Sequence, residues 1–379
     1  MSIFLDDFNS DAGWSKVGVW VDSTYSISGG ENTLTAGTNK DTSAWTRTGF
    51  EGRNVSITVR AGASVTGTPQ IHLREASSGN YLIAYIDPND GTLNIGKVVA
   101  GTYTSLGSVA ISSFSSANTY TFTAKVWENL LFASYLRTQS DGDIGGQIES
   151  ISSDVNNFTG TGAGIGVTSG TQKYAWIDFR NLETLTNVVC VGDSNVGPDN
   201  RLFWPNQMMK RRFTNGFVSR NKGAGGYSTQ DVYDDRATKI DPYIVSKADN
   251  VLSIATGNND FVDGLSAAAT YVKQQTLMTY AKGLGYRIEL ATLIPFVYAG
   301  DPLAFVTSLN TAIRAGASVD GFTLCEIHNA FGATDGVAGV VPTSLVQADE
   351  IHYTTATGQP LATRTHLHVL KRNDRNPVT

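Results

Sequence analysis

Ser194 and His352 have side-chain types and sequence positions that suit nucleophilic chemistry. Ser194 lies in the segment Gly-Asp-Ser-Asn, directly after a run of apolar, β-branched residues. A serine hydroxyl is a poor nucleophile unless a base takes its proton. Histidine suits that role because its unperturbed pKa, about 6.5, lies near neutral pH. Asp349 precedes His352 by three residues, so its carboxylate can reach Nδ1–H and leave Nε2 free as a base.

Two further segments contain groups that donate hydrogen bonds. Residues 221–226, Asn-Lys-Gly-Ala-Gly-Gly, offer backbone N–H groups that no side chain obstructs. Residues 257–260, Gly-Asn-Asn-Asp, offer the side-chain amide of Asn259. Such donors stabilise an oxyanion when they converge on one point. Taken alone, each segment also fits a simpler structure: residues 221–226 a flexible loop, and Gly-Asp-Ser a polar turn that caps a helix.

The elements that must position these groups follow from the pattern after residue 187. Continuous apolar runs, typical of strands buried on both faces, alternate with helical stretches. The strands are predicted at 188–191, 250–255, 287–294 and 321–327, and the helical stretches at 201–212, 229–247 (with Pro242 as an interruption), 265–282 and 302–315. This alternation predicts a parallel sheet with helices on both faces, whose ligand site lies at the carboxyl ends of the strands. The candidate groups should therefore meet at one edge of the sheet.

The order of these segments resembles the four sequence blocks of SGNH (GDSL-like) hydrolases. Gly-Asp-Ser, a glycine loop, Gly-x-Asn-Asp and Asp-x-x-His follow one another over about residues 187–370, each after the appropriate strand. The resemblance implies a flavodoxin-like, three-layer α/β/α fold in residues 185–379. It also implies hydrolysis of carboxylic esters through an acyl-enzyme, without a cofactor.

The resemblance also assigns a role to each candidate residue. Ser194 corresponds to the nucleophile, His352 to the general base and later acid, and Asp349 to the residue that orients the histidine. The N–H groups of Ser194 and Gly226 and the side chain of Asn259 correspond to the oxyanion hole.

Neighbouring residues qualify this assignment. Gly225 and Gly223 are alternatives to Gly226, because the loop contains three glycines. Asn195 stands where the family name suggests leucine, at a position that supports the fold. The resemblance implies that Asp193 and Asp260 support their turns and take no part in catalysis.

Residues 1–184 follow a different pattern, with short alternating strands separated by Gly/Ser/Thr/Asn turns. This pattern predicts an all-β sandwich of the jelly-roll type. Residues 3–8 and 174–182 are both apolar-acidic-aromatic strands, and they resemble the paired terminal strands of concanavalin-like (laminin-G-type) modules. Such a module would bind glycans or act as a spacer.

Composition excludes several other functions. The formal net charge is −6 and no basic stripe is present, which argues against nucleic acid as a partner. The N-terminus does not read as a secretory signal, and no apolar stretch approaches the roughly 20 residues that span a bilayer. We therefore expect a protein that is cytoplasmic as synthesised, or that reaches a virion or the exterior after lysis.

The remaining cysteines and histidines do not form a recognisable site. Cys190 and Cys325 lie in apolar strands and are expected to be buried free thiols. His328 is expected to be a hydrogen-bonded histidine at the rim of the cleft, with contact to substrate as the alternative. His366 and His368 would bind a metal only with further ligands, which the sequence does not identify. No metal site is therefore predicted.

The catalytic blocks leave the ester undetermined. A β-rich module in front favours an acetylated polysaccharide as substrate, so we expect a carbohydrate O-deacetylase. Two alternatives stay open: a bacteriophage tail or capsid appendage that binds or trims host surface glycans, and a general short-chain esterase or lipase. A homo-oligomer or a virion assembly would fit the second of these readings.

Overall fold

The computed structural model describes most of the chain from residue 3 to residue 373, with side chains from residue 52 onward except at 77, 144, 176 and 371–373. The residues outside the description are 1–2, 7–13, 17–23, 29–30, 36–42, 62–66, 78, 138–143, 168–170, 198–203, 206–207, 209–215, 297, 334–344, 348–351, 355–356 and 374–379.

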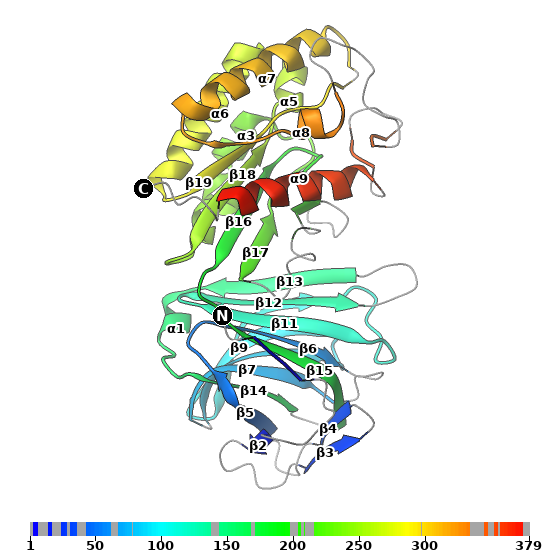
Figure 1. Cartoon of the computed structure of the whole chain (residues 1–379), viewed down its shortest axis with the longest axis vertical. Helices are drawn as coiled ribbons and strands as arrows, with labels where there is room; N and C mark the ends of the chain where they lie inside the picture. The colour runs from blue at the N-terminus through cyan, green and yellow to red at the C-terminus, as the bar shows by residue number, and fades with distance from the viewer. Residues whose placement is uncertain are drawn as a thin grey trace. The chain divides into compact units, whose positions relative to one another are not determined.

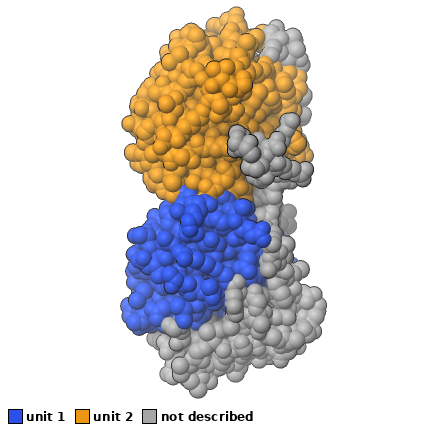
Figure 2. Space-filling view, turned by 60° about the vertical axis from the view of Figure 1, so that its left-hand side comes forward, with its two compact units in different colours: residues 1–185, 213–216, 245–247 blue, residues 186–212, 217–244, 248–379 orange. Residues whose placement is uncertain are grey.

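The chain forms two compact units (Figure 2). Unit 1 comprises residues 1–185, 213–216 and 245–247, and unit 2 comprises residues 186–212, 217–244 and 248–379.

Unit 1 contains two antiparallel sheets (Figure 1). In the first sheet the described strands follow the order β13 (Ile144–Ile151), β12 (Leu130–Arg137), β11 (Tyr120–Trp127), β6 (Val55–Ala61), β15 (Thr171–Asn181), β4 (Glu31–Thr35) and β3 (Thr24–Ser28), with β1 (Ile3–Asp6) also paired to β15. In the second sheet the order is β10 (Thr102–Ala110), β9 (Thr92–Val99), β8 (Asn80–Asp87), β7 (Pro69–Ser77), β14 (Gly162–Val167), β5 (Ser43–Glu51) and β2 (Trp14–Lys16).

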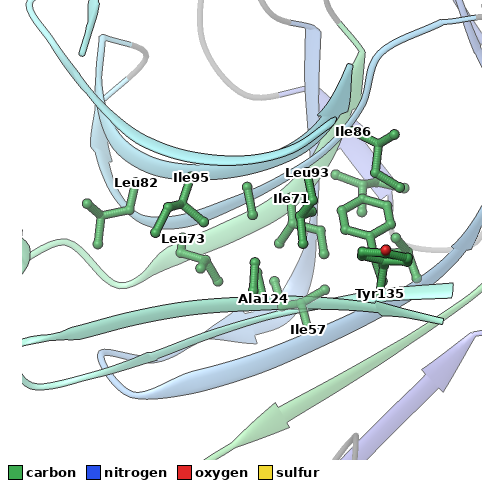
Figure 3. Close-up of a cluster of buried hydrophobic side chains, with 14 of the residues drawn as sticks. Ile57, Ile71, Leu73, Leu82, Ile86, Leu93, Ile95, Ala124 and Tyr135 are labelled. Atoms are coloured by element: carbon green, nitrogen blue, oxygen red, sulfur yellow. The ribbon is translucent and has the colours of Figure 1, made fainter. Parts of the chain in front are cut away.

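The core of unit 1 lies between the inward faces of these two sheets. Ile57 and Ala124 come from the first sheet, while Ile71, Leu82 and Ile95 come from the second, and all five are fully buried (Figure 3). Alternate residues of each strand point inward because the side chains of a strand alternate between its two faces. Full burial of one large aliphatic side chain stabilises the fold by about 1.5–3 kcal/mol. A single helical turn, α1 (Ser153–Asn156), adds Val155 to this core.

The strands near the two ends of unit 1 pair as the sequence predicts. β1 runs antiparallel to β15, with Phe4 opposite Phe179 and Leu5 opposite Asp178. β1 is thus an additional strand of the first sheet, paired with β15. The jelly-roll connectivity stays a prediction.

Unit 2 contains a parallel sheet with the order β17-β16-β18-β19-β20. The bounds of its strands are β16 (Thr186–Gly192), β17 (Phe217–Asn221), β18 (Asp249–Ala255), β19 (Arg287–Ala291) and β20 (Thr323–Cys325). β16, the first of these strands in the sequence, therefore lies between β17 and β18, so the side of the sheet on which strands are added switches after β17. In sheets of this kind, the ligand site lies at the carboxyl ends of the strands beside such a switch.

Helices cover the sheet of unit 2. Their bounds are α3 (Thr229–Asp234), α4 (Arg236–Lys239), η1 (Asp241–Tyr243), α5 (Asn258–Val262), α6 (Ala267–Gly283), α7 (Pro302–Val319), α8 (Ile327–Ala330) and α9 (Gly358–Asn373). Leu252 and Ile288 point to one face, where they pack with residues of α3, α6 and α7. Ser253 and Glu289, the next residues along, point to the other face and contact His366 of α9. The predicted α/β/α arrangement of three layers is confirmed for this unit.

The segment between β17 and β18 is helical and is interrupted at Pro242, as predicted. Its helices are shorter than the predicted stretch 229–247: α3, α4 and the 3₁₀ turn η1 extend from residue 229 to residue 243. α3 begins with a reciprocal capping box, in which the Ser228 hydroxyl accepts from the Asp231 N–H and the Asp231 side chain accepts from the Ser228 N–H. Pro242 lies in η1, where its missing N–H prevents a helix from continuing.

Among the helices that the structure describes, none combines the length and the apolar character needed to span a membrane.

Candidate active site

The turn after β16 depends on a glycine. Gly192 has φ +158°, and a Cβ atom placed there would lie 2.2 Å from the carbonyl oxygen of Ala255 on the neighbouring strand β18. No other residue fits so close to that backbone. The carbonyl of Gly192 also accepts a hydrogen bond from Ala224 N–H at 3.0 Å. Gly192 therefore allows the end of β16 to lie close to both neighbouring strand ends.

Hydrogen bonds to Asp193 stabilise the turn that contains Ser194. Asp193 is buried, and its side-chain Oδ1 accepts a hydrogen bond from Asn195 N–H at 2.8 Å. Its carbonyl oxygen accepts from the N–H groups of Val196 and Gly197. Burial raises the pKa of the Asp193 carboxyl to about 6, although the Asn195 N–H bond opposes this shift. These contacts agree with the predicted supporting role, and they leave the Ser194 side chain partly exposed at the sheet edge.

Ser194 and His352 lie in direct contact, although 158 residues separate them in the chain. The distance from Ser194 Oγ to His352 Nε2 is 2.7 Å, and both residues are partly exposed. This is the distance at which an imidazole nitrogen can take the hydroxyl proton. The ring nitrogen involved is Nε2, the one that the sequence assigned to the base.

Backbone hydrogen bonds fix the segment that carries His352. The His352 carbonyl accepts from Gln347 N–H at 2.7 Å, next to an antiparallel bridge between Val346 and Tyr353. On the other side, Tyr353 N–H donates to Asn195 Oδ1 at 3.1 Å. The histidine is thus held both by its own loop and by the residue after Ser194.

Asp349 lies outside the described residues. Its expected role, to orient His352, stays a prediction.

The glycine loop after β17 packs against the serine turn. A Cβ atom on Gly223 would lie 2.6 Å from Val196 Cβ, so the loop approaches the turn closely at this point. The N–H of Gly223 donates to Asn221 Oδ1 at 3.1 Å, which occupies this donor. Gly226 has φ +80°, a conformation that favours glycine, and Cβ atoms on Gly225 or Gly226 would meet nothing within 4 Å. These contacts favour Gly226 or Gly225 over Gly223 as the loop donor.

Asn259 lies in the first turn of α5, after the neighbouring strand β18. Its Nδ2 donates to the carbonyl oxygen of Tyr227 at 3.0 Å, which joins the amide to the end of the glycine loop. A carboxamide nitrogen carries two N–H bonds, so one remains to point elsewhere. Asp260 is fully buried and accepts from both the N–H and the hydroxyl of Thr229 at 2.9 Å. Burial raises the pKa of Asp260, whose contacts fit the predicted supporting role.

Asn195 and Gln359 make contacts in the site that were not predicted from the sequence. Asn195 was expected only to support the fold, yet its side chain holds the backbone next to His352. Gln359, in the first turn of α9, donates from Nε2 to the Asn195 carbonyl at 3.4 Å and accepts from Trp204 N–H at 2.8 Å. The sequence did contain a signal for Asn195, because an amide directly after the candidate nucleophile needs hydrogen-bond partners when it is buried. Gln359 had no signal, because its partners are 155 and 164 residues away.

The other candidates take different positions. His328 is buried, its N–H donates to Thr292 Oγ1 and its Nδ1 lies 3.3 Å from Asn329 Oδ1, which agrees with a hydrogen-bonded structural histidine. Cys190 and Cys325 are buried and form no disulfide, as predicted.

Three solved structures are similar in fold to about half of this chain. A lipolytic protein of the G-D-S-L family from Veillonella parvula is 19% identical, with a TM-score of 0.40, over 49% of this chain and 98% of its own. The protein TesA is 20% identical, with a TM-score of 0.39, over 49% and 98%. An acetyl-xylooligosaccharide esterase from Geobacillus is 15% identical, with a TM-score of 0.40, over 49% and 95%. The matched half is the one that contains Ser194. The sequence matches no protein-family model, and it matches no curated protein.

Proposed function

We propose that this chain is a serine esterase in which Ser194 attacks the carbonyl carbon of a carboxylic ester. The observation that carries the proposal is the contact between Ser194 Oγ and His352 Nε2 at 2.7 Å. The imidazole takes the hydroxyl proton as the oxygen attacks, and it then gives that proton to the leaving alcohol. Water attacks the resulting acyl-enzyme by the same route and releases the acid.

The tetrahedral intermediate needs donors for its negative oxygen. The Ser194 N–H, the Gly226 N–H and the second N–H of the Asn259 amide are proposed for this role. The bond from Asn259 Nδ2 to the Tyr227 carbonyl supports it, because it sets the amide beside the residue that follows Gly226. Donors fixed in advance stabilise the intermediate without reorganising during the reaction.

Within this function, we propose an acetylated polysaccharide as the substrate. Tyr298 supports this choice, since it follows β19 at the same edge of the sheet and its side chain is 46% exposed. Its ring packs edge-on against Phe261, two residues after Asn259, with centroids 6.2 Å apart. An exposed aromatic face held in this way is suited to stack on a sugar ring. The separate β-rich unit 1 favours the same class of substrate.

The test is a panel of p-nitrophenyl esters of increasing acyl length beside acetylated polysaccharides, with Ser194→Ala as the control. We expect turnover of short acyl esters, acetate release from the polysaccharide, and loss of both activities in the variant. Turnover that survives in Ser194→Ala would refute the nucleophile. Activity confined to long-chain esters would refute the polysaccharide while leaving the esterase intact.

A further inference from the structure

Three side chains of types that can bind a metal ion lie close together on the face of the unit 2 sheet that α9 covers. Glu289 comes from β19, Cys325 from β20 and His366 from α9. One donor atom from each, a carboxylate oxygen, a thiol sulfur and an imidazole nitrogen, lies within 4.8 Å of the other two. All three side chains are at most 1% exposed. The cluster therefore lies in the interior, where polar groups need partners.

The contacts within the cluster leave one strong acceptor unsatisfied. Glu289 Oε1 contacts His366 Nδ1 and accepts from Ser253 Oγ at 2.8 Å, and Cys325 Sγ lies 3.4 Å from the same nitrogen. Glu289 Oε2 is buried and has no hydrogen-bond partner among the described residues. A buried, unsatisfied polar atom costs about 1–3 kcal/mol, and more when it is charged. An ion pair between His366 and Glu289 satisfies Oε1 alone.

A divalent cation would satisfy the cluster as a whole. With the thiol and the carboxyl deprotonated and the imidazole neutral, the three side chains carry two negative charges, which one divalent ion neutralises. Sulfur, nitrogen and oxygen donors together are the ligand set that zinc uses in proteins. Glu289, Cys325 Sγ and His366 Nδ1 supply three donor atoms, and the unsatisfied second oxygen of Glu289 would be the fourth if its carboxylate bound through both oxygens. Structural zinc sites are usually four-coordinate.

We propose that Glu289, Cys325 and His366 form a structural site for a divalent transition-metal ion, best suited to Zn²⁺. The ion would join α9 to β19 and β20. The indole ring of Trp204 stacks on the imidazole of His366 with centroids 3.7 Å apart and planes 1° apart, which fixes the orientation of the ring. No activity of Ser194 is needed for this site.

The wide separation of these three ligands along the chain is the reason that no metal site is predicted from the sequence. His366 has no ligand at a short spacing, because its partners are 41 and 77 residues away. Neighbouring parallel strands bring Glu289 and Cys325 together, and α9 places His366 over them. His368, the other histidine of this helix, is exposed.

Cobalt substitution tests the proposal. The full chain is purified from zinc-supplemented cells, its metal content is measured, and the metal is replaced with Co²⁺. We expect close to one zinc per chain, and in the cobalt protein a thiolate-to-cobalt charge-transfer band in the near ultraviolet. Cys325→Ser should lose this band. Cys190→Ser should retain it, since Cys190 is a buried thiol on β16 outside the cluster.

Two further measurements separate this proposal from its alternatives. A chelator should lower the melting temperature of the wild-type protein and should leave that of Cys325→Ser unchanged. Ser194→Ala should bind cobalt as the wild type does, so a failure of the proposed esterase would not affect the result. A folded wild-type chain that holds no metal and shows no thiolate band overturns the site, and leaves an ion pair between Glu289 and His366. The spectrum of the wild type decides this even if a variant fails to fold.

Discussion

Asn195 Oδ1 accepts a hydrogen bond from the N–H of Tyr353 at 3.1 Å, so the residue after Ser194 holds the residue after His352. The two halves of the candidate catalytic pair come from segments 158 residues apart. Their contact at 2.7 Å therefore depends on a bond between their immediate neighbours. Leucine, which the family name suggests at this position, has no acceptor for the Tyr353 N–H.

Asn195→Leu is expected to lower kcat towards p-nitrophenyl acetate by about ten- to a hundredfold, because loss of the acceptor displaces His352 from Ser194. KM should change much less, since Asn195 is buried. Steady-state kinetics measure both values. Gln359→Leu is the comparison: it disturbs the Asn195 carbonyl and Trp204 without removing the acceptor for Tyr353, and it should affect stability more than kcat. A wild-type kcat in Asn195→Leu would contradict the positioning role.

Asn259→Ala is expected to lower kcat by about 10²–10³, which is typical for the loss of one oxyanion donor. Asn258→Ala is the matched control, because Asn258 is the neighbouring asparagine in α5 and has no proposed part in the oxyanion hole. Its activity should stay near that of the wild type. Equal losses in the two variants would show that the helix start, and not the Asn259 amide, limits the rate.

The buried Asp193 carboxyl should make stability depend on pH. Burial raises its pKa from the ordinary value of 3.8 to about 6 in the folded protein, so folding favours the protonated form. The stabilising contribution is therefore fully present below about pH 3.8 and is lost as the pH rises through about 6. The shift of roughly two pKa units corresponds to about 3 kcal/mol.

Asp193→Asn isolates this contribution, because the amide oxygen can still accept from Asn195 N–H while the group no longer titrates. The unfolding free energy of the wild type minus that of the variant should fall by up to about 3 kcal/mol between pH 4 and pH 8. Denaturant unfolding at several pH values measures the difference. A difference independent of pH would contradict the raised pKa.

Tyr298→Ala should raise KM for an acetylated polysaccharide several-fold, since loss of a stacking contact costs about 1 kcal/mol. The kinetic constants for p-nitrophenyl acetate should stay unchanged, because this ester has no sugar ring. Tyr298→Phe retains the ring and should behave as the wild type. A rise in KM for both substrates would place Tyr298 in the acyl pocket and not in a sugar subsite.

Much of unit 2 could be predicted from local patterns. The alternation of apolar runs and helical stretches indicates a parallel sheet, and the Gly-Asp-Ser turn after the first run places Ser194 at its carboxyl edge. These are properties of short segments, so neighbouring residues suffice to predict them. The same reasoning located the helical stretch at residues 229–247 and its interruption at Pro242, but it did not predict the further break at Asp235, between α3 and α4.

The contacts between distant segments required the tertiary structure. The bond from Asn195 to Tyr353, and the meeting of Glu289, Cys325 and His366, join residues that no periodicity or spacing relates. Strand order and helix packing decide which side chains meet, and these depend on the whole core. The residue types of the catalytic site were therefore readable along the chain. Its geometry, and the cluster beneath α9, exist only once the sheet is assembled.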